Sequence, residues 1–164
     1  MEQNRIYRLP EREFFTGFAL ENYKCEANLG ISFRTACALG VADFFATIGE
    51  RYHKPRTDVI DSYRQLPVWQ FKNCDDFYDH IPLACDVVAL ELSPRSVPLH
   101  EFEWPKRCIV VAGSEGDGLS KDILQKARYV VSLPSIGVSI NVSSAMAIVA
   151  YQRWNWLRQK GFAK

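Results

Sequence analysis

The sequence predicts an α/β protein with a mostly parallel sheet and helices on both faces. Short apolar runs alternate with helical patterns along the chain. The first run, the helical pattern after it and the next run fit within about 35 residues, which suits a right-handed βαβ unit. Two later apolar runs end in polar turns that each lead into a helix. Ligands of open α/β sheets bind outside such strand ends, so we expect the site there.

The bulk composition narrows the class of protein. The chain has 164 residues, of which 48% are hydrophobic and 24% charged, as in one globular domain over residues 1–164. The net charge is +1, so a nucleic-acid partner would need local basic patches. The 5 cysteines form no Cys-x-x-Cys pair, which favours a reducing, cytoplasmic location and no metal site. We expect no membrane association, because no apolar run approaches ~20 residues.

The first half of the chain begins with a polar arm over residues 1–12. Residues 14–20 and 41–48 are aromatic or β-branched runs and predict strands. Between them, Asn28 is a candidate N-cap of a helix and Gly40 suits the position just past its end. Residues 49–65 are polar and basic with interleaved tyrosines, and we expect a loop there.

The second half continues the alternation. Strands are expected at residues 66–69, 86–92, 108–112 and 129–134, and helical segments at 75–80, 121–128 and 141–160. The last helix has an apolar stripe at i, i+3, i+4 and i+7, made by Val142, Ala145, Met146 and Val149. Asn141 is a candidate N-cap of this helix. The basic residues Arg153, Arg158 and Lys160 are expected to form a cationic end.

A glycine-rich turn, residues 113–120, follows one strand and precedes a helical segment, as phosphate-binding loops do. It carries Glu115 and Asp117 and no lysine before Lys121. Two carboxylates at a helix N-terminus would repel a phosphate, which disfavours a dinucleotide or a nucleoside triphosphate. Taken alone, the turn is either a ligand loop or a tight strand–helix turn with acidic capping.

Three motifs occur in order: Asn28-x-Gly30-x-x-x-Arg34, Gly113-x-Glu115-x-x-Gly118-Leu119-Ser120, and Leu133-Pro134 followed by Ser139-Ile140-Asn141-Val142-Ser143. Together they resemble the SpoU–TrmH family, within the SPOUT class of RNA methyltransferases, over about residues 14–157. The resemblance implies a deep trefoil knot in the C-terminal part (about residues 85–160), which also binds S-adenosylmethionine. It further implies a homodimer and methyl transfer to a ribose 2′-hydroxyl of RNA.

The resemblance also implies residue roles. The catalytic residues would be Arg34, Asn28, Glu115, Ser139 and Asn141. The cofactor contacts would be Leu90, Gly113, Gly118, Leu133 and Ile140. The loop between Pro134 and Ser139 departs from the family, because it is shorter than usual and has Ser135 where methionine is common.

The resemblance gives Arg34 the role of the catalytic base. Arginine, however, has a pKa above ~12, and an efficient base titrates near the working pH. We expect Arg34 to grip a phosphate, polarise the 2′-hydroxyl and stabilise the developing alkoxide. Further RNA contacts are expected from Arg51, Lys54 and Arg56. Without a separate N-terminal RNA-binding domain, transfer RNA is favoured over ribosomal RNA.

Other interpretations stay open. The chain could be a non-catalytic relative that binds RNA or S-adenosylmethionine, or an unrelated doubly wound nucleotide-binding domain. The Trp154–Trp156 region could lie in a dimer interface, since aromatic residues favour interfaces, or pack against the first helix of its own chain.

Overall fold

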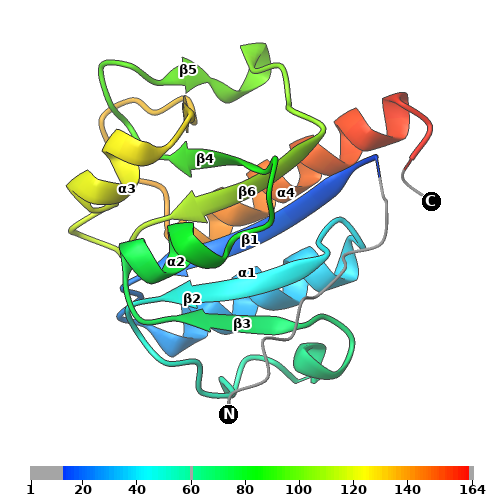
Figure 1. The fold of residues 1–164 in the computed structure, drawn as a ribbon. Coiled ribbons are helices and arrows are strands. Elements are labelled where there is room, and N and C mark those ends of the chain that lie inside the picture. Colours follow the sequence, from blue (N-terminus) through cyan, green and yellow to red (C-terminus); the bar gives the residue numbers. More distant parts are fainter. Residues whose placement is uncertain (1–12, 60, 163–164) are drawn as a thin grey trace.

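A computed structural model describes residues 13–59 and 61–162, so the expected arm over residues 1–12 lies outside the described residues. The strands form one sheet in the order β3-β2-β1-β6-β4-β7-β5, and every neighbouring pair is parallel (Figure 1). The strands are β1 (Phe15–Glu21), β2 (Phe44–Ile48), β3 (Val68–Phe71), β4 (Asp86–Leu90), β5 (Val97–Pro98), β6 (Arg107–Ala112) and β7 (Tyr129–Ser132). The predicted parallel sheet is confirmed.

Helices cover both faces of the sheet, as predicted. The helices are α1 (Glu26–Ala38), α2 (Cys74–His80), α3 (Lys121–Lys126) and α4 (Val142–Gln159), with short 3₁₀ helices at Ser62–Arg64 and Leu99–Glu101. Helices α1 and α4 lie side by side on one face, and α2 and α3 cover the other (Figure 1). In the described part of the chain, no helix combines the length and apolarity that crossing a membrane requires.

The central strands are apolar without a break because both of their faces are buried. Side chains alternate between the two faces of a strand. In β6, Cys108 and Val110 therefore join the core under α1 and α4, whereas Ile109 and Val111 join the core under α2 and α3. The site at the carboxyl ends of these strands thus rests on a sheet that is packed from both sides.

The expected helix cap at Asn28 is wrong. Helix α1 begins at Glu26, with Cys25 at the N-cap and no side-chain hydrogen bond there. Asn28 therefore lies in the first turn, where its buried side chain accepts a hydrogen bond from Asn141 on α4. The other end of the helix is as predicted, since Gly40 follows it with a φ of 61°.

The expected cationic end of the last helix is wrong at Arg153. This residue is 0% exposed, and its guanidinium lies 5.3 Å from the Trp104 ring centroid and 4.7 Å from that of Trp156. It donates to Thr16 Oγ1 and to Lys106 O at 2.9 Å each. Arg153 therefore ties α4 to the starts of β1 and β6 and is no part of the surface.

Several boundaries differ from those predicted. The strand expected over 41–48 begins at residue 44, the one expected over 66–69 runs from 68 to 71, and the one expected over 86–92 ends at 90. Just after β4, Leu92 N donates a hydrogen bond to Glu91 Oε1 at 3.0 Å. This amide therefore has a side-chain partner and not a partner in a neighbouring strand. Strand β5 was not predicted, because it is a two-residue edge strand that contains a proline, a residue that sheets accept at their edges.

Candidate functional site

The three sequence motifs meet at one hydrogen-bonded cluster. Asn141 Nδ2 donates to Asn28 Oδ1 at 3.1 Å and also to Glu115 Oε1. Asn28 comes from α1, Glu115 from the turn after β6, and Asn141 from the start of α4. A side-chain amide has two donor hydrogens, so these bonds use both. Side chains far apart in the sequence are thereby held in one place.

The other side of the Asn141 amide fixes its orientation. Its Oδ1 accepts from Ser143 N at 2.9 Å and from Ser143 Oγ at 2.6 Å. Asn141 is thus the N-cap of α4, as predicted. Because a backbone N–H can only donate, the oxygen must face the helix and the NH₂ group must face Glu115. The start of α4 therefore orients Asn141, which in turn orients Glu115.

The glycine-rich turn needs its glycines. A Cβ on Gly113 would lie 2.0 Å from the carbonyl carbon of Gly118, and Gly118 itself has a φ of 69°. The turn is closed by Gly118 N, which donates to Ser114 O at 3.0 Å. Within the turn, the exposed Asp117 pairs with Lys24 from the loop before α1, and this hydrogen-bonded ion pair lowers the pKa of the Asp117 carboxyl. The backbone of the turn is therefore closely constrained.

Two carboxylates that no motif contains hold the end of this turn. Glu91 Oε2 accepts from Leu119 N at 2.9 Å, and Glu21 Oε2 accepts from Ser120 N at 2.8 Å. Both amides precede α3, where a phosphate would otherwise bind. The chain's own carboxylates occupy them, which favours the acidic strand–helix turn over a phosphate cradle. In the sequence, Glu21 and Glu91 each directly follow two apolar strand residues, a position that does not by itself indicate this role.

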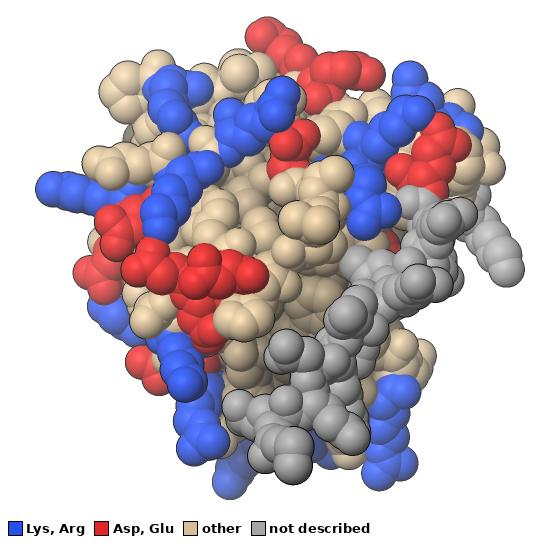
Figure 2. All heavy atoms as spheres, viewed as in Figure 1, with Lys and Arg blue, Asp and Glu red and all other residues tan. Residues whose placement is uncertain are grey.

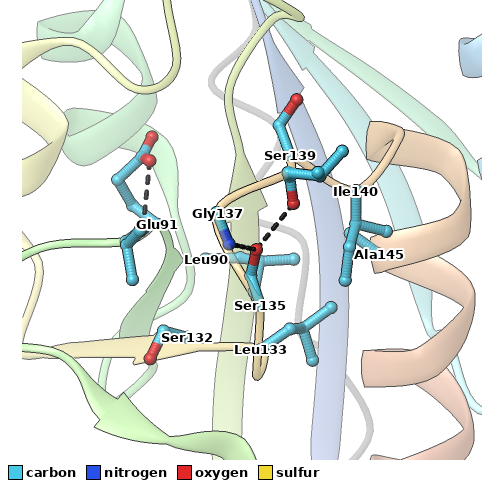
Figure 3. Close-up of a pocket in the computed structure, with 11 residues that line it drawn as sticks. Leu90, Glu91, Ser132, Leu133, Ser135, Gly137, Ser139, Ile140 and Ala145 are labelled. Atoms are coloured by element: carbon cyan, nitrogen blue, oxygen red, sulfur yellow. Dashed lines mark hydrogen bonds between the residues drawn. The ribbon is translucent and has the colours of Figure 1, made fainter.

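Two adjoining cavities, of about 520 Å³ and 400 Å³, open beside the turn. They share five residues, all of which Figure 3 shows around the smaller cavity: Leu90, Glu91, Ser139, Ile140 and Ala145. All residues predicted to contact the cofactor line one or both of them: Leu90, Gly113, Gly118, Leu133 and Ile140. Of the predicted catalytic residues, Glu115, Ser139 and Asn141 line the larger cavity. The structure thus brings these residues together, while their roles stay predictions.

The shortened loop closes through its own serine. Ser135 Oγ donates to Val138 O at 2.6 Å and accepts from Gly137 N at 3.3 Å (Figure 3). Gly137 has a φ of 97°, which the sharp reversal requires. Ser135 therefore does in this chain a structural task that methionine could not do. Ile136 and Val138 of the same loop are exposed, and Val138 lines the smaller cavity.

Arg34 does not join the cluster within one chain. It is exposed on α1 and does not line the two cavities, and it forms no hydrogen bond or ion pair with any residue in 13–59 or 61–162. Six residues along a helix correspond to about 120° around the axis, so Arg34 faces away from Asn28. Within one chain, the predicted catalytic Arg34 therefore lies apart from the other predicted catalytic residues.

The expected RNA contacts Arg51, Lys54 and Arg56 are exposed on the segment after β2. Lys54 pairs with Asp61, and this ion pair raises the pKa of the lysine. The segment is ordered by buried Asp58, whose Oδ1 accepts from Ser62 N at 2.9 Å. On the face in Figure 2, basic and acidic side chains are interspersed.

The tryptophans near the C-terminus make contacts within the chain. Trp156 Nε1 donates to Glu103 Oε1 at 3.4 Å, and its ring lies 5.7 Å from that of Phe14. Trp154 stacks on Tyr151 at 5.7 Å. Packing within one chain therefore accounts for Trp156, although its partners are Phe14, just before β1, and Glu103, before β6, and not the first helix. Among the residues with described positions, no group of His, Cys, Asp and Glu is arranged to hold a metal ion.

Comparisons with known proteins give the family. Residues 17–151 match the SpoU rRNA Methylase family. A tRNA (guanosine(18)-2′-O)-methyltransferase of Borreliella burgdorferi is 28% identical over 90% of this chain and 70% of its own length. The AdoMet-bound rRNA methyltransferase of Sinorhizobium meliloti superposes with a TM-score of 0.79 at 26% identity, over 90% of this chain and 57% of that one. The match over most of the sequence, with all three motifs meeting in one site, places this chain in the SpoU rRNA Methylase family.

Proposed function

We propose that this protein transfers a methyl group from S-adenosylmethionine to a ribose 2′-hydroxyl of RNA, and that the RNA is transfer RNA. The observation that carries the proposal is the Asn28–Asn141–Glu115 cluster at the edge of the large cavity. The Borreliella relative, whose name gives this reaction on tRNA, supports the choice of substrate. A cytoplasmic location belongs to the proposal, because the methyl donor and the RNA are made there.

The cavities fit the proposed cofactor. Their combined space lies within the range of pockets that hold ligands of this size. Leu90, Leu133, Ile140 and Ala145 form an apolar wall suited to an adenine ring. Within residues 13–59 and 61–162, the charged residues that line the two cavities are Glu91 and Glu115, which suits a ligand with a sulfonium and an ammonium group. When bound, S-adenosylmethionine would supply an electrophilic methyl group.

The chain's own residues would position the ribose and stabilise charge. The 2′-oxygen must lie in line with the methyl group, and Glu115 is held for this task by Asn141. The hydroxyl of Ser139 faces the same cavity and has no hydrogen-bond partner among the described residues, so it is free to bind substrate. Arg34 would hold a phosphate and stabilise the developing alkoxide with its planar donors.

We propose that Arg34 reaches this site from a second copy of the chain. The outer side of α1 and α4 carries Arg34 and three exposed apolar side chains, Ile31, Ile148 and Tyr151, which are 42%, 45% and 57% exposed. Burial of this surface would stabilise a homodimer. The same assembly would supply the arginine that one chain does not bring to its own cluster. The deep knot over about residues 85–160 also belongs to this proposal.

The RNA would contact the segment after β2. Arg51 and Arg56 are exposed and form no ion pair with a residue of the described ranges, so their charge is available to phosphates. Lys54 would contribute less, because Asp61 already partly neutralises it.

The reaction is tested by incubating the protein with unmodified tRNA and S-adenosylmethionine and analysing the nucleosides by mass spectrometry. The proposal expects a 2′-O-methylnucleoside. Cofactor binding without methylation of any RNA pool would instead support the non-catalytic relative.

The shared site is tested by mixing two inactive variants, Arg34→Ala and Asn141→Ala. If Arg34 acts across a dimer, mixed dimers contain one intact site, and random mixing restores about a quarter of the wild-type activity. If Arg34 acts within its own chain, the mixture stays inactive.

A further inference from the structure

We infer that Glu91 recognises the cationic end of S-adenosylmethionine, a role that goes beyond the motifs and rests on the proposed function. Glu91 directly follows β4 and belongs to none of the motifs. It lines both cavities. Figure 3 shows it on the opposite side of the cavity from Ile140 and Ala145. It therefore faces the apolar wall across the space that the cofactor would fill.

The geometry fixes the Glu91 carboxylate before any ligand binds. Its Oε1 accepts from Leu92 N at 3.0 Å and its Oε2 accepts from Leu119 N at 2.9 Å. Each carboxylate oxygen has a second lone pair, so both can accept a further hydrogen bond. A carboxylate held in this way needs little reorganisation to bind an ammonium group, and it also offers its charge to a sulfonium.

The charges around the cavity favour the same assignment. Among the residues that the structure describes, no lysine, arginine or histidine lines either cavity, so the charge that these residues place there is negative. Glu115 is exposed and accepts a hydrogen bond from Asn141, whereas Glu91 is half-buried. Burial reduces screening by water, so the charge of Glu91 acts more strongly on a cation in the cavity.

Glu21 provides a matched control. It is 3% exposed and holds the next amide of the same turn, Ser120 N, at 2.8 Å. It lines neither cavity. A substitution of Glu21 thus removes a carboxylate that holds the turn and leaves the lining of the cavity unchanged.

Calorimetry of Glu91→Gln and Glu21→Gln with three ligands tests the inference. S-adenosylmethionine carries a sulfonium and an ammonium, S-adenosylhomocysteine only the ammonium, and 5′-deoxy-5′-methylthioadenosine neither. We expect Glu91→Gln to weaken the binding of S-adenosylmethionine by about tenfold or more, the typical effect of losing a hydrogen bond to a charged group. The affinity of the same variant for S-adenosylhomocysteine should fall by a smaller factor, and its affinity for methylthioadenosine should fall by less than about twofold. Glu21→Gln should change the affinities for all three ligands by one common factor.

An equal loss for all three ligands in Glu91→Gln would show that Glu91 only holds the turn, and an unchanged affinity for S-adenosylmethionine would also overturn the inference. If Glu91→Gln does not fold, Glu91→Asp is compared with Glu91→Asn instead, because these two variants have the same shape and differ from each other in charge. The proposed function fails separately, when the wild-type protein binds none of the three ligands.

Discussion

The buried arginine of α4 allows a quantitative prediction about stability. Arg153 is 0% exposed and donates three close hydrogen bonds: to Thr16 Oγ1 at 2.9 Å, to Pro105 O at 2.8 Å and to Lys106 O at 2.9 Å. Its burial lowers the pKa of the guanidinium, because the charged form loses hydration. Arg153→Ala would leave these acceptors without their donor and open a cavity between Trp104 and Trp156.

The magnitude follows from opposing contributions. Each hydrogen bond to a charged group contributes about 1.5–3 kcal/mol, so the three together contribute roughly 4.5–9 kcal/mol. Removing the charge recovers the several kcal/mol that its desolvation costs. We expect a net loss of about 3–5 kcal/mol in the free energy of unfolding. Arg153→Lys should lose about 2–3 kcal/mol, because a single ammonium nitrogen cannot reproduce the fork of donors.

Urea denaturation followed by tryptophan fluorescence measures this loss. The control is Arg158→Ala, because Arg158 lies on the same helix but is exposed. This variant should lose no more than about 0.5 kcal/mol in the free energy of unfolding. A loss below about 1 kcal/mol for Arg153→Ala would refute the reasoning, since it would mean that the three hydrogen bonds only balance the desolvation of the charge.

Three further predictions concern the site and the thiols. Gly113→Ala should abolish cofactor binding in calorimetry, because its Cβ would lie 2.0 Å from the carbonyl carbon of Gly118. Gly116→Ala would meet no atom within 4 Å and should retain binding, although an alanine at its φ of 93° should cost about 1–3 kcal/mol of stability. Asn141→Asp keeps the acceptor that caps α4 but places a carboxylate beside Glu115. Like charges raise the pKa of a carboxyl in the folded state, so the variant should lose stability above that pKa and regain it relative to wild type as the pH falls to about 4. Equal losses in urea denaturation at pH 4 and pH 7 would contradict this. Burial raises the pKa of Cys108 to about 12, whereas Cys25 is exposed. At pH 8 a thiol reagent should therefore label Cys25 in the native protein and Cys108 only after unfolding, as peptide mass spectrometry would show.

The sequence predicted the elements that are decided locally. The buried strands appear as continuous apolar runs, because a parallel sheet covered on both faces has no polar side. The cap of α4 at Asn141 and the end of α1 at Gly40 were predicted from residue type, because each acts on amides or carbonyls close by in the chain. The errors at Asn28 and Arg153 have the opposite cause. Both side chains have the local pattern of a cap or a surface cation, but their partners lie far away in the sequence.

The candidate site could be predicted only in part for the same reason. Glu21 and Glu91 were missed because an acidic residue after an apolar run looks like any residue at a strand end. Their importance depends on the strand order, in which β6 lies between β1 and β4. That order places one carboxylate on each side of the turn that leaves β6, so two adjacent amides are held by two different strands. The turn and Glu115 with it are thereby fixed by the sheet itself. A site built in this way is rigid on the side of the cofactor, and its remaining freedom lies in the arginine that we expect a second chain to supply.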